Sequence, residues 1–170
     1  DGDGNGSSIV DIGAYELPTI FVSKSGSHQP PFHAWAVAAT NIQDAVEVAS
    51  NGYLVVVTNG TYTPPAPVSV TRDMLLQSVN GPAVTAINGA GVRRGLYLAG
   101  EGVVDGFSIT NGYHASQGGG VYCATGGTLR NCWVRRNASG QYGGGIYIQG
   151  TGTVVQCTIT ENQVTMHGGG

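Results

Sequence analysis

The first residues of the chain have the oxygen-bearing side chains of a calcium-binding loop. Asp1, Asp3 and Asn5 alternate with glycines, and a glycine follows at position 6. Calcium loops place hard oxygen donors at positions 1, 3 and 5 and use that glycine for a sharp turn. The Glu expected at position 12 is absent, so Asp11 or Glu16 would have to supply this carboxylate. The pattern indicates Ca²⁺ at Asp1, Asp3, Asn5 and Asp11, with a solvated Asx-rich turn as the alternative.

Aromatic side chains suggest a second kind of chemistry. Tyr97, Tyr122 and Tyr147 are spaced 25 residues apart, and Trp133 with Arg135 lies on another segment. Such residues can bind a ligand by stacking against sugar rings, with Arg135 binding an acidic group. Cross-strand stacking of the tyrosines on one another is the structural alternative.

The acidic residues argue against catalysis. Those in the repeats are Asp73, Glu101, Asp105 and Glu161, and they occupy different repeat positions. Hydrolysis of a glycosidic bond needs two carboxylates roughly 5 to 9.5 Å apart. We therefore expect no catalytic residue in this chain.

The net charge of the chain argues against a nucleic-acid-binding protein. The net charge is −3, which is not the basic footprint of a nucleic-acid-binding protein. Arg130, Arg135 and Arg136 form a local basic group, and Glu161 follows Arg136 by 25 residues. An exposed Arg136–Glu161 ion pair is the simpler interpretation, and an anionic-sugar site is the alternative.

A repeat decides the fold class. Glycine triplets begin at Gly118, Gly143 and Gly168, and the residues between them also match at a 25-residue period. The apolar segments are short, alternating and rich in Val, Ile, Thr and Tyr, which favours strands over helices. We predict an all-β parallel β-helix of three-strand coils of about 25 residues.

The period also predicts which side chains point inward. The rows that should face the core are Leu96/Val121/Ile146, Leu98/Cys123/Ile148, Phe107/Cys132/Cys157 and Ile109/Val134/Ile159. Cys132 and Cys157 are expected to be buried reduced thiols, with a disulfide between them as the alternative. The tyrosines, Ser108/Trp133/Thr158 and Thr110/Arg135/Thr160 should face outward. Asn137 and Asn162 should bond along the stack at a turn that tolerates left-handed backbone.

One amphipathic helix is expected over 41–50, where Ile42, Ala45, Val46 and Ala49 recur at helical spacing. Thr40 and Gln43 have the spacing of a capping box. We expect this helix to cover the first coil, as open solenoid ends need a cap.

The chain resembles a known superfamily. Ile20-Phe21-Val22-Ser23, the segment from Ala38 to Val46, and Val57 to Tyr62 resemble the opening of right-handed parallel β-helix proteins of the pectate-lyase-like superfamily. More narrowly, the chain is similar to bacterial choice-of-anchor Q domain surface proteins. Asp3 to Glu16, with Asp-Ile-Gly-Ala-Tyr-Glu, resembles the element that closes such a domain. The resemblance implies a right-handed helix and an extracellular or cell-surface location.

The order of these elements predicts assembly. We divide the chain into a closing element (1–17), a lead strand and helix (18–53), and coils (54–170) that should be open at their C-terminal end. The chain has no signal peptide and no membrane-spanning run, so we expect a segment of something longer. The expected subunit contacts are Ile9, Val10, Ile12, Tyr15, Gly168, Gly169 and Gly170.

The sequence therefore favours a structural or adhesive module that stacks head to tail on copies of itself, in a tandem array or a filament. The alternative is a β-helix that binds or degrades a polysaccharide. Calcium is the only cofactor expected.

Overall fold

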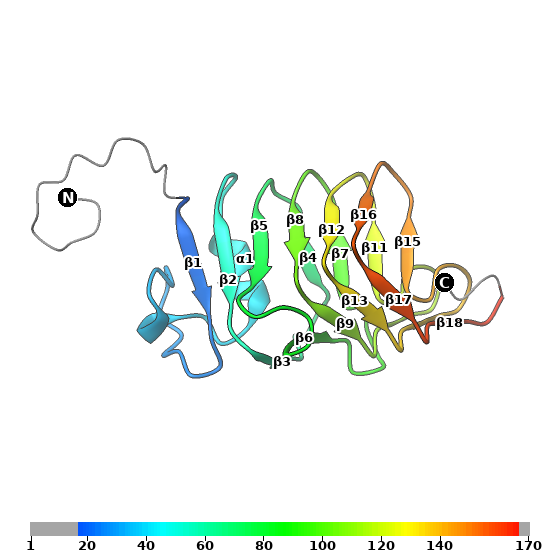
Figure 1. The fold of residues 1–170 in the computed structure, drawn as a ribbon, viewed down its shortest axis with the longest axis horizontal. Coiled ribbons are helices and arrows are strands. Elements are labelled where there is room, and N and C mark those ends of the chain that lie inside the picture. Colours follow the sequence, from blue (N-terminus) through cyan, green and yellow to red (C-terminus); the bar gives the residue numbers. More distant parts are fainter. Residues whose placement is uncertain (1–16, 167–170) are drawn as a thin grey trace, which may run out of the picture.

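The computed structural model describes residues 17–166, which wind into a parallel β-solenoid with one α-helix (Figure 1). Successive coils lie side by side along the long axis, so strands far apart in sequence become neighbours. Three main sheets run along this axis, and a fourth, of two-residue strands, runs along the last three coils. Within residues 17–166 all neighbouring strands in the four sheets run parallel, as in the predicted fold class.

Four sheets contain all the named strands of the described chain. Sheet A consists of β1 (Thr19–Val22), β2 (Leu54–Val57), β5 (Leu75–Ser78), β8 (Val103–Asp105), β12 (Thr128–Arg130) and β16 (Thr153–Val155). Sheet B consists of β3 (Gly60–Tyr62), β6 (Thr85–Asn88), β9 (Ser108–Thr110), β13 (Trp133–Arg135) and β17 (Thr158–Thr160). Sheet C consists of β4 (Val68–Val70), β7 (Leu96–Leu98), β11 (Val121–Cys123) and β15 (Ile146–Ile148). Sheet D, which the sequence did not predict, consists of β10 (Tyr113–His114), β14 (Ala138–Ser139) and β18 (Gln163–Val164).

The predicted register is confirmed. Tyr122 lies between Tyr97 and Tyr147, and Val134 lies between Ile109 and Ile159. The longer offset earlier in the chain is also found, because Val68 pairs with Leu96. The three additional residues lie in turns, which leaves the strands stacked.

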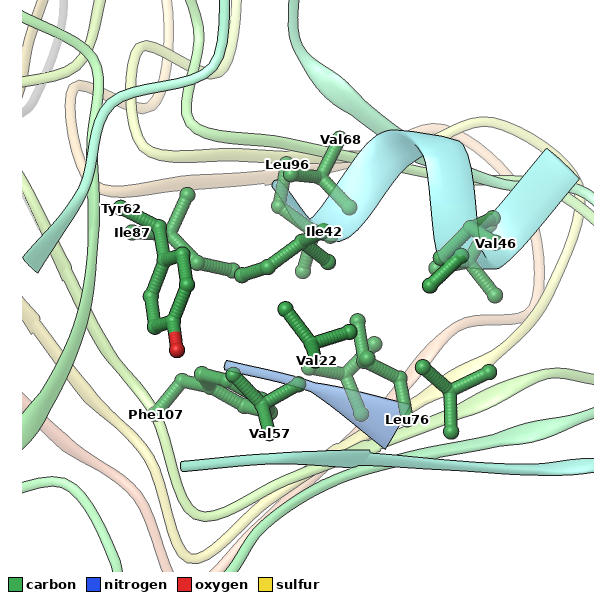
Figure 2. Packing of buried hydrophobic residues seen from close by; sticks show 14 of the residues in the cluster. Val22, Ile42, Val46, Val57, Tyr62, Val68, Leu76, Ile87, Leu96 and Phe107 are labelled. Carbon is green, nitrogen blue, oxygen red and sulfur yellow. The ribbon is translucent and has the colours of Figure 1, made fainter. Parts of the chain in front are cut away.

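The core lies inside the coils, between the inward faces of the sheets (Figure 2). The predicted inward rows are fully buried at Leu96, Leu98, Phe107 and Ile109 and at their partners one coil on. On the last described coil the same rows are more exposed, with Ile148 42% and Ile159 40% accessible. Inward orientation is therefore correct for these rows, but burial in this structure is complete only where coils lie on both sides.

Helix α1 (Ile42–Val48) lies near the N-terminal end of the solenoid and packs on β1, β2 and β4 (Figure 1). Ile42 and Val46 point from it toward the core beside Val68, as Figure 2 shows. The predicted Thr40–Gln43 capping box is wrong by one residue. The N-cap is Asn41, whose Oδ1 accepts a hydrogen bond from the Asp44 N–H at 2.9 Å. Thr40 instead contacts His28, with its Oγ1 2.9 Å from Nδ1.

Two asparagines, the buried Asn137 and the half-buried Asn162, connect three coils, as predicted. Asn137 is 1% exposed, and its Oδ1 accepts from the Gly112 N–H at 2.7 Å. Its Nδ2 donates to the Ile109 carbonyl at 2.9 Å and to Asn162 Oδ1 at 3.0 Å. The left-handed residues of this turn are Arg136 and Glu161 rather than the asparagines, with φ of 55° and 56°. The preceding residue makes the bend, which leaves the amide free to bond along the stack.

Close backbone packing explains the two glycine triplets within the described residues. A Cβ at Gly119 would lie 1.9 Å from the Ala138 carbonyl oxygen, and one at Gly144 would lie 1.8 Å from that of Gln163. Gly118 and Gly143, which open the triplets, have φ of +59° and +51°. Only glycine meets both requirements without strain.

Among residues 17–166, no helix has the length and apolar character needed to cross a bilayer.

Replacing Asn137 with Ala should destabilise the fold by about 2–4 kcal/mol, because the Gly112 N–H and Ile109 carbonyl lose their buried partner. Denaturant unfolding followed by circular dichroism measures this free energy. Asn80→Ala is the matched control: this exposed side chain bonds to exposed Asn59, so the expected loss is below about 0.5 kcal/mol. Equal losses in the two variants would contradict the account of the turn.

Candidate functional site

The three predicted tyrosines form a continuous stack on the outer face of sheet C. The Tyr97 and Tyr122 centroids are 5.7 Å apart with ring planes 12° apart, and those of Tyr122 and Tyr147 are 5.7 Å apart with planes 14° apart. Each ring therefore faces the next one along the axis. The two faces of the Tyr122 ring are turned toward protein, which favours cross-strand stabilisation over stacking on a sugar.

An arginine supports this stack. The Arg94 Cζ lies 4.5 Å from the Tyr122 centroid. Its Nε donates to the Gly118 carbonyl at 2.8 Å, and a terminal nitrogen donates to that of Gln117 at 2.6 Å. Partial burial lowers the pKa of Arg94, and Tyr122 acts against this. The guanidinium is thus held by the turn and the ring together.

Trp133 and Arg135 lie on sheet B, on a different face from the tyrosines. The Arg135 Cζ is 5.3 Å from the Trp133 ring centroid. The five residues predicted to bind a ligand therefore form two separate groups.

A hollow of about 330 Å³ lies beside this pair, and we call it the sheet B hollow. Its floor comes from β6 and β9, and the 82–84 loop contributes to its lining. The polar residues that line it are Thr61, Thr85, Asn88, Ser108, Thr110, Asn111, Arg135 and Arg136. None of the described residues that line it is acidic.

Ser108 was predicted to face outward, but its side chain is buried. Strand alternation places it on the outer side of β9, between Ala86 and Trp133, yet it is only 2% exposed. Trp133 on the adjacent strand is the large neighbour that we expect to cover it. Within 17–166 the Ser108 Oγ has no hydrogen-bond partner. An outward register does not by itself predict that the Ser108 hydroxyl is buried. The sequence feature that could have predicted it is the row of two small residues, Ala86 and Ser108, next to the large Trp133.

The predicted group of three arginines is divided by the coil. Arg130 lies on sheet A, where its Nε is 3.0 Å from Asp105 Oδ2. Arg136 forms the predicted exposed ion pair, with its Nε 2.6 Å from Glu161 Oε2. That contact lowers the pKa of Glu161 and raises the pKa of Arg136 through hydrogen bonding and charge. Arg135 forms no ion pair with any described residue.

The three cysteines are free thiols, as predicted for Cys132 and Cys157. The Cys132 Sγ accepts from the Phe107 N–H at 3.3 Å, and the Cys157 Sγ accepts from the Cys132 N–H at 3.4 Å. Burial raises the pKa of Cys123 to about 11. A hydrogen bond with Cys157, followed by burial, raises the pKa of Cys132. Cys123 and Cys132 are therefore buried, protonated core residues at neutral pH. Cys157 is only half-buried, and its hydrogen bond with Cys132 lowers its pKa to about 7.

The sequence did not indicate a polar contact between the loop after β1 and helix α1. His28 Nε2 lies 3.1 Å from Asp44 Oδ2, which joins the loop after β1 to helix α1. Across the described part of the chain, no group of three or more His, Cys, Asp or Glu could hold a metal. The calcium candidates Asp1, Asp3, Asn5 and Asp11 lie outside the described residues. So do the predicted contacts Ile9, Val10, Ile12, Tyr15, Gly168, Gly169 and Gly170.

Comparison with solved structures supports the fold. The chain is similar to a pectin methylesterase mutant in complex with a hexasaccharide, with a TM-score of 0.54 and 13% identity. The match covers 84% of this chain and 55% of that enzyme, so the chain spans little more than half of the enzyme's length. At this identity the likeness shows the parallel β-helix fold alone. No protein-family model and no curated protein matches the chain.

If the tyrosine stack is structural, Tyr122→Ala should destabilise the fold by about 1–3 kcal/mol, because two ring contacts and the Arg94 contact are lost. Tyr122→Phe is the matched control and should cost less than about 0.5 kcal/mol, since it removes only the exposed hydroxyl bond to Gln149. Thermal and denaturant unfolding measure both. An unchanged stability in Tyr122→Ala would contradict a structural role.

Proposed function

We propose that the chain is a non-catalytic structural or adhesive module, extracellular or on the cell surface, that stacks end to end in a tandem array or a filament. The observation that carries this proposal is the apolar face of the last described coil. Ile148 and Ile159 are 42% and 40% exposed, whereas Cys123 and Val134, their partners one coil earlier, are fully buried. Core-type side chains in this position need a covering layer.

The coil edge offers hydrogen bonds as well. β15, β16, β17 and β18 are edge strands of their sheets. An unpaired parallel edge is a template for another strand. A covering layer of β-structure would therefore satisfy backbone groups and bury the apolar rows together.

The proposed occupant is the closing element of the next module or copy. Its apolar residues Ile9, Val10, Ile12 and Tyr15 fall within residues 9–15 and would supply the apolar side of this contact. The opposite end of the solenoid is packed against helix α1, so the two ends are not equivalent. This polarity favours head-to-tail contacts, which extend indefinitely unless rotation closes a ring.

The assembly test is sedimentation velocity over the micromolar range. We expect the chain to form larger species with concentration, because each contact would bury the exposed rows. Ile148→Lys and deletion of residues 1–16 should each abolish this, because they charge or remove one side of the contact. Val92→Lys is the control, since Val92 is 67% exposed and lies away from the last coil. A chain that stays monomeric throughout would contradict the proposal.

We further propose calcium at Asp1, Asp3, Asn5 and Asp11, because these donors adjoin the apolar residues of the closing element. Removing calcium with EGTA should weaken assembly, and excess Ca²⁺ should restore it, while Mg²⁺ should not. Assembly that is insensitive to EGTA would contradict the calcium site and leave the stacking contact intact.

A second function is polysaccharide binding, favoured by the half-buried Trp133 and Arg135 side by side on sheet B and by the hexasaccharide bound to the similar enzyme. The described carboxylates give little support to hydrolysis. Asp105 contacts Arg130 and Asn131, and Glu161 contacts Arg136. Neither is paired with a second carboxylate for acid–base work.

A further inference from the structure

The unpartnered Ser108 hydroxyl marks the sheet B hollow as more than a surface irregularity. Ser108 lines the hollow, is 2% exposed and has no hydrogen-bond partner within the described chain. Buried polar side chains in native proteins almost always have a partner, so an orphan of this kind calls for one. A ligand in the hollow would supply it.

The charge of the hollow defines the class of ligand. Arg135 and Arg136 line it, and no described residue of the lining is acidic. Glu161 neutralises Arg136 through their ion pair. The charge of Arg135 makes a smaller contribution to the lowered pKa of Glu161. Arg135 has no ion-pair partner of its own in residues 17–166. The Trp133 ring lies beside it, with its centroid 5.3 Å from the Arg135 Cζ. A cationic hollow without a carboxylate attracts an anion.

The donors come from three adjacent strands. Asn88 lies on β6, Ser108 and Thr110 on β9, and Arg135 on β13. Thr110 is the lateral neighbour of both Asn88 and Arg135. The Asn88 Oδ1 accepts from the Ala90 N–H at 2.9 Å, which leaves the Nδ2 end as the donor. Several donors gathered on one sheet face can bond the three free oxygens of a tetrahedral ester, whereas a planar carboxylate offers only two oxygens.

We propose that the sheet B hollow binds a tetrahedral oxyanion, a sulfate or phosphate group, with Arg135 as its cation and Ser108 as a buried donor. Trp133 lies directly beside Ser108 in the sheet register. Its ring centroid is also 5.3 Å from the Arg135 Cζ, so an anion bound to Arg135 should change the fluorescence of Trp133. The site is independent of the proposed stacking contact, which involves the coil end.

The test is Trp133 fluorescence in a Trp35→Phe background, because the chain has two tryptophans. The probes are sodium phosphate and sodium sulfate, with sodium acetate as the planar anion, all at one ionic strength held with sodium chloride. We expect a saturable change with phosphate or sulfate and none with acetate. The tighter of the two identifies the ester. Absence of saturation with both, or an equal response to acetate, would overturn the proposal.

Variants assign the site. Arg135→Gln should weaken binding by about tenfold or more, the usual cost of losing a hydrogen bond to a charged group. Lys24→Gln removes the same charge far along the chain and should leave affinity unchanged. Ser108→Ala should also weaken binding without lowering the melting temperature, since its hydroxyl is unpaired; Ser69→Ala on sheet C is its control. Affinity that is unchanged in Arg135→Gln, or equally reduced in Lys24→Gln, would place the anion elsewhere.

Discussion

Backbone hydrogen bonding between successive coils is the constraint on which the rest of the structure depends. The strands are two to four residues long, and each pairs only with strands of the coils before and after it. A coil therefore cannot satisfy its own backbone, and its position is fixed by its neighbours. The glycine triplets, the asparagine row and the tyrosine stack all act on this contact. The glycines allow two coils to approach closely, the asparagines form hydrogen bonds between coils, and the tyrosines pack against one another on the outer face.

The same dependence explains which features the sequence could predict. A residue in register with its equivalents 25 positions away inherits their orientation, so the rows around Val121, Val134 and Tyr122 followed from spacing alone. Asn137 was predictable for the same reason. These assignments needed the repeat and no knowledge of the turns.

Features outside the repeat were harder to predict. The N-cap is Asn41 rather than Thr40 because the chain direction after the β1 loop sets where the helix begins. The His28–Asp44 contact joins elements that no period relates. Ser108 has the outward register that spacing implies, yet it is buried beside the large Trp133 on the next strand, and spacing does not take the size of such a neighbour into account. The position of the N-cap, the His28–Asp44 contact and the burial of Ser108 depend on local packing, which the 25-residue period does not describe.

A solenoid of this kind has distinct surfaces for distinct roles. The sheet faces run along its sides, and the sheet B hollow lies on one of them. The unpaired coil edges lie at its ends. The hydrogen-bonding constraint that joins coils within the chain applies equally to the edge of the last described coil. We therefore regard stacking as an extension of the folding principle to contacts between modules. Ligand binding on sheet B would then be repeated once per module along an array.

Electron microscopy of the purified chain tests the stacking claim most directly. Sheet A has six strands, so one module should advance the axis by roughly 30 Å at the spacing of neighbouring strands. The account predicts unbranched filaments with that axial repeat, which disappear in Ile148→Lys. Uniform single particles of one module, in the presence of calcium and at high concentration, would contradict it.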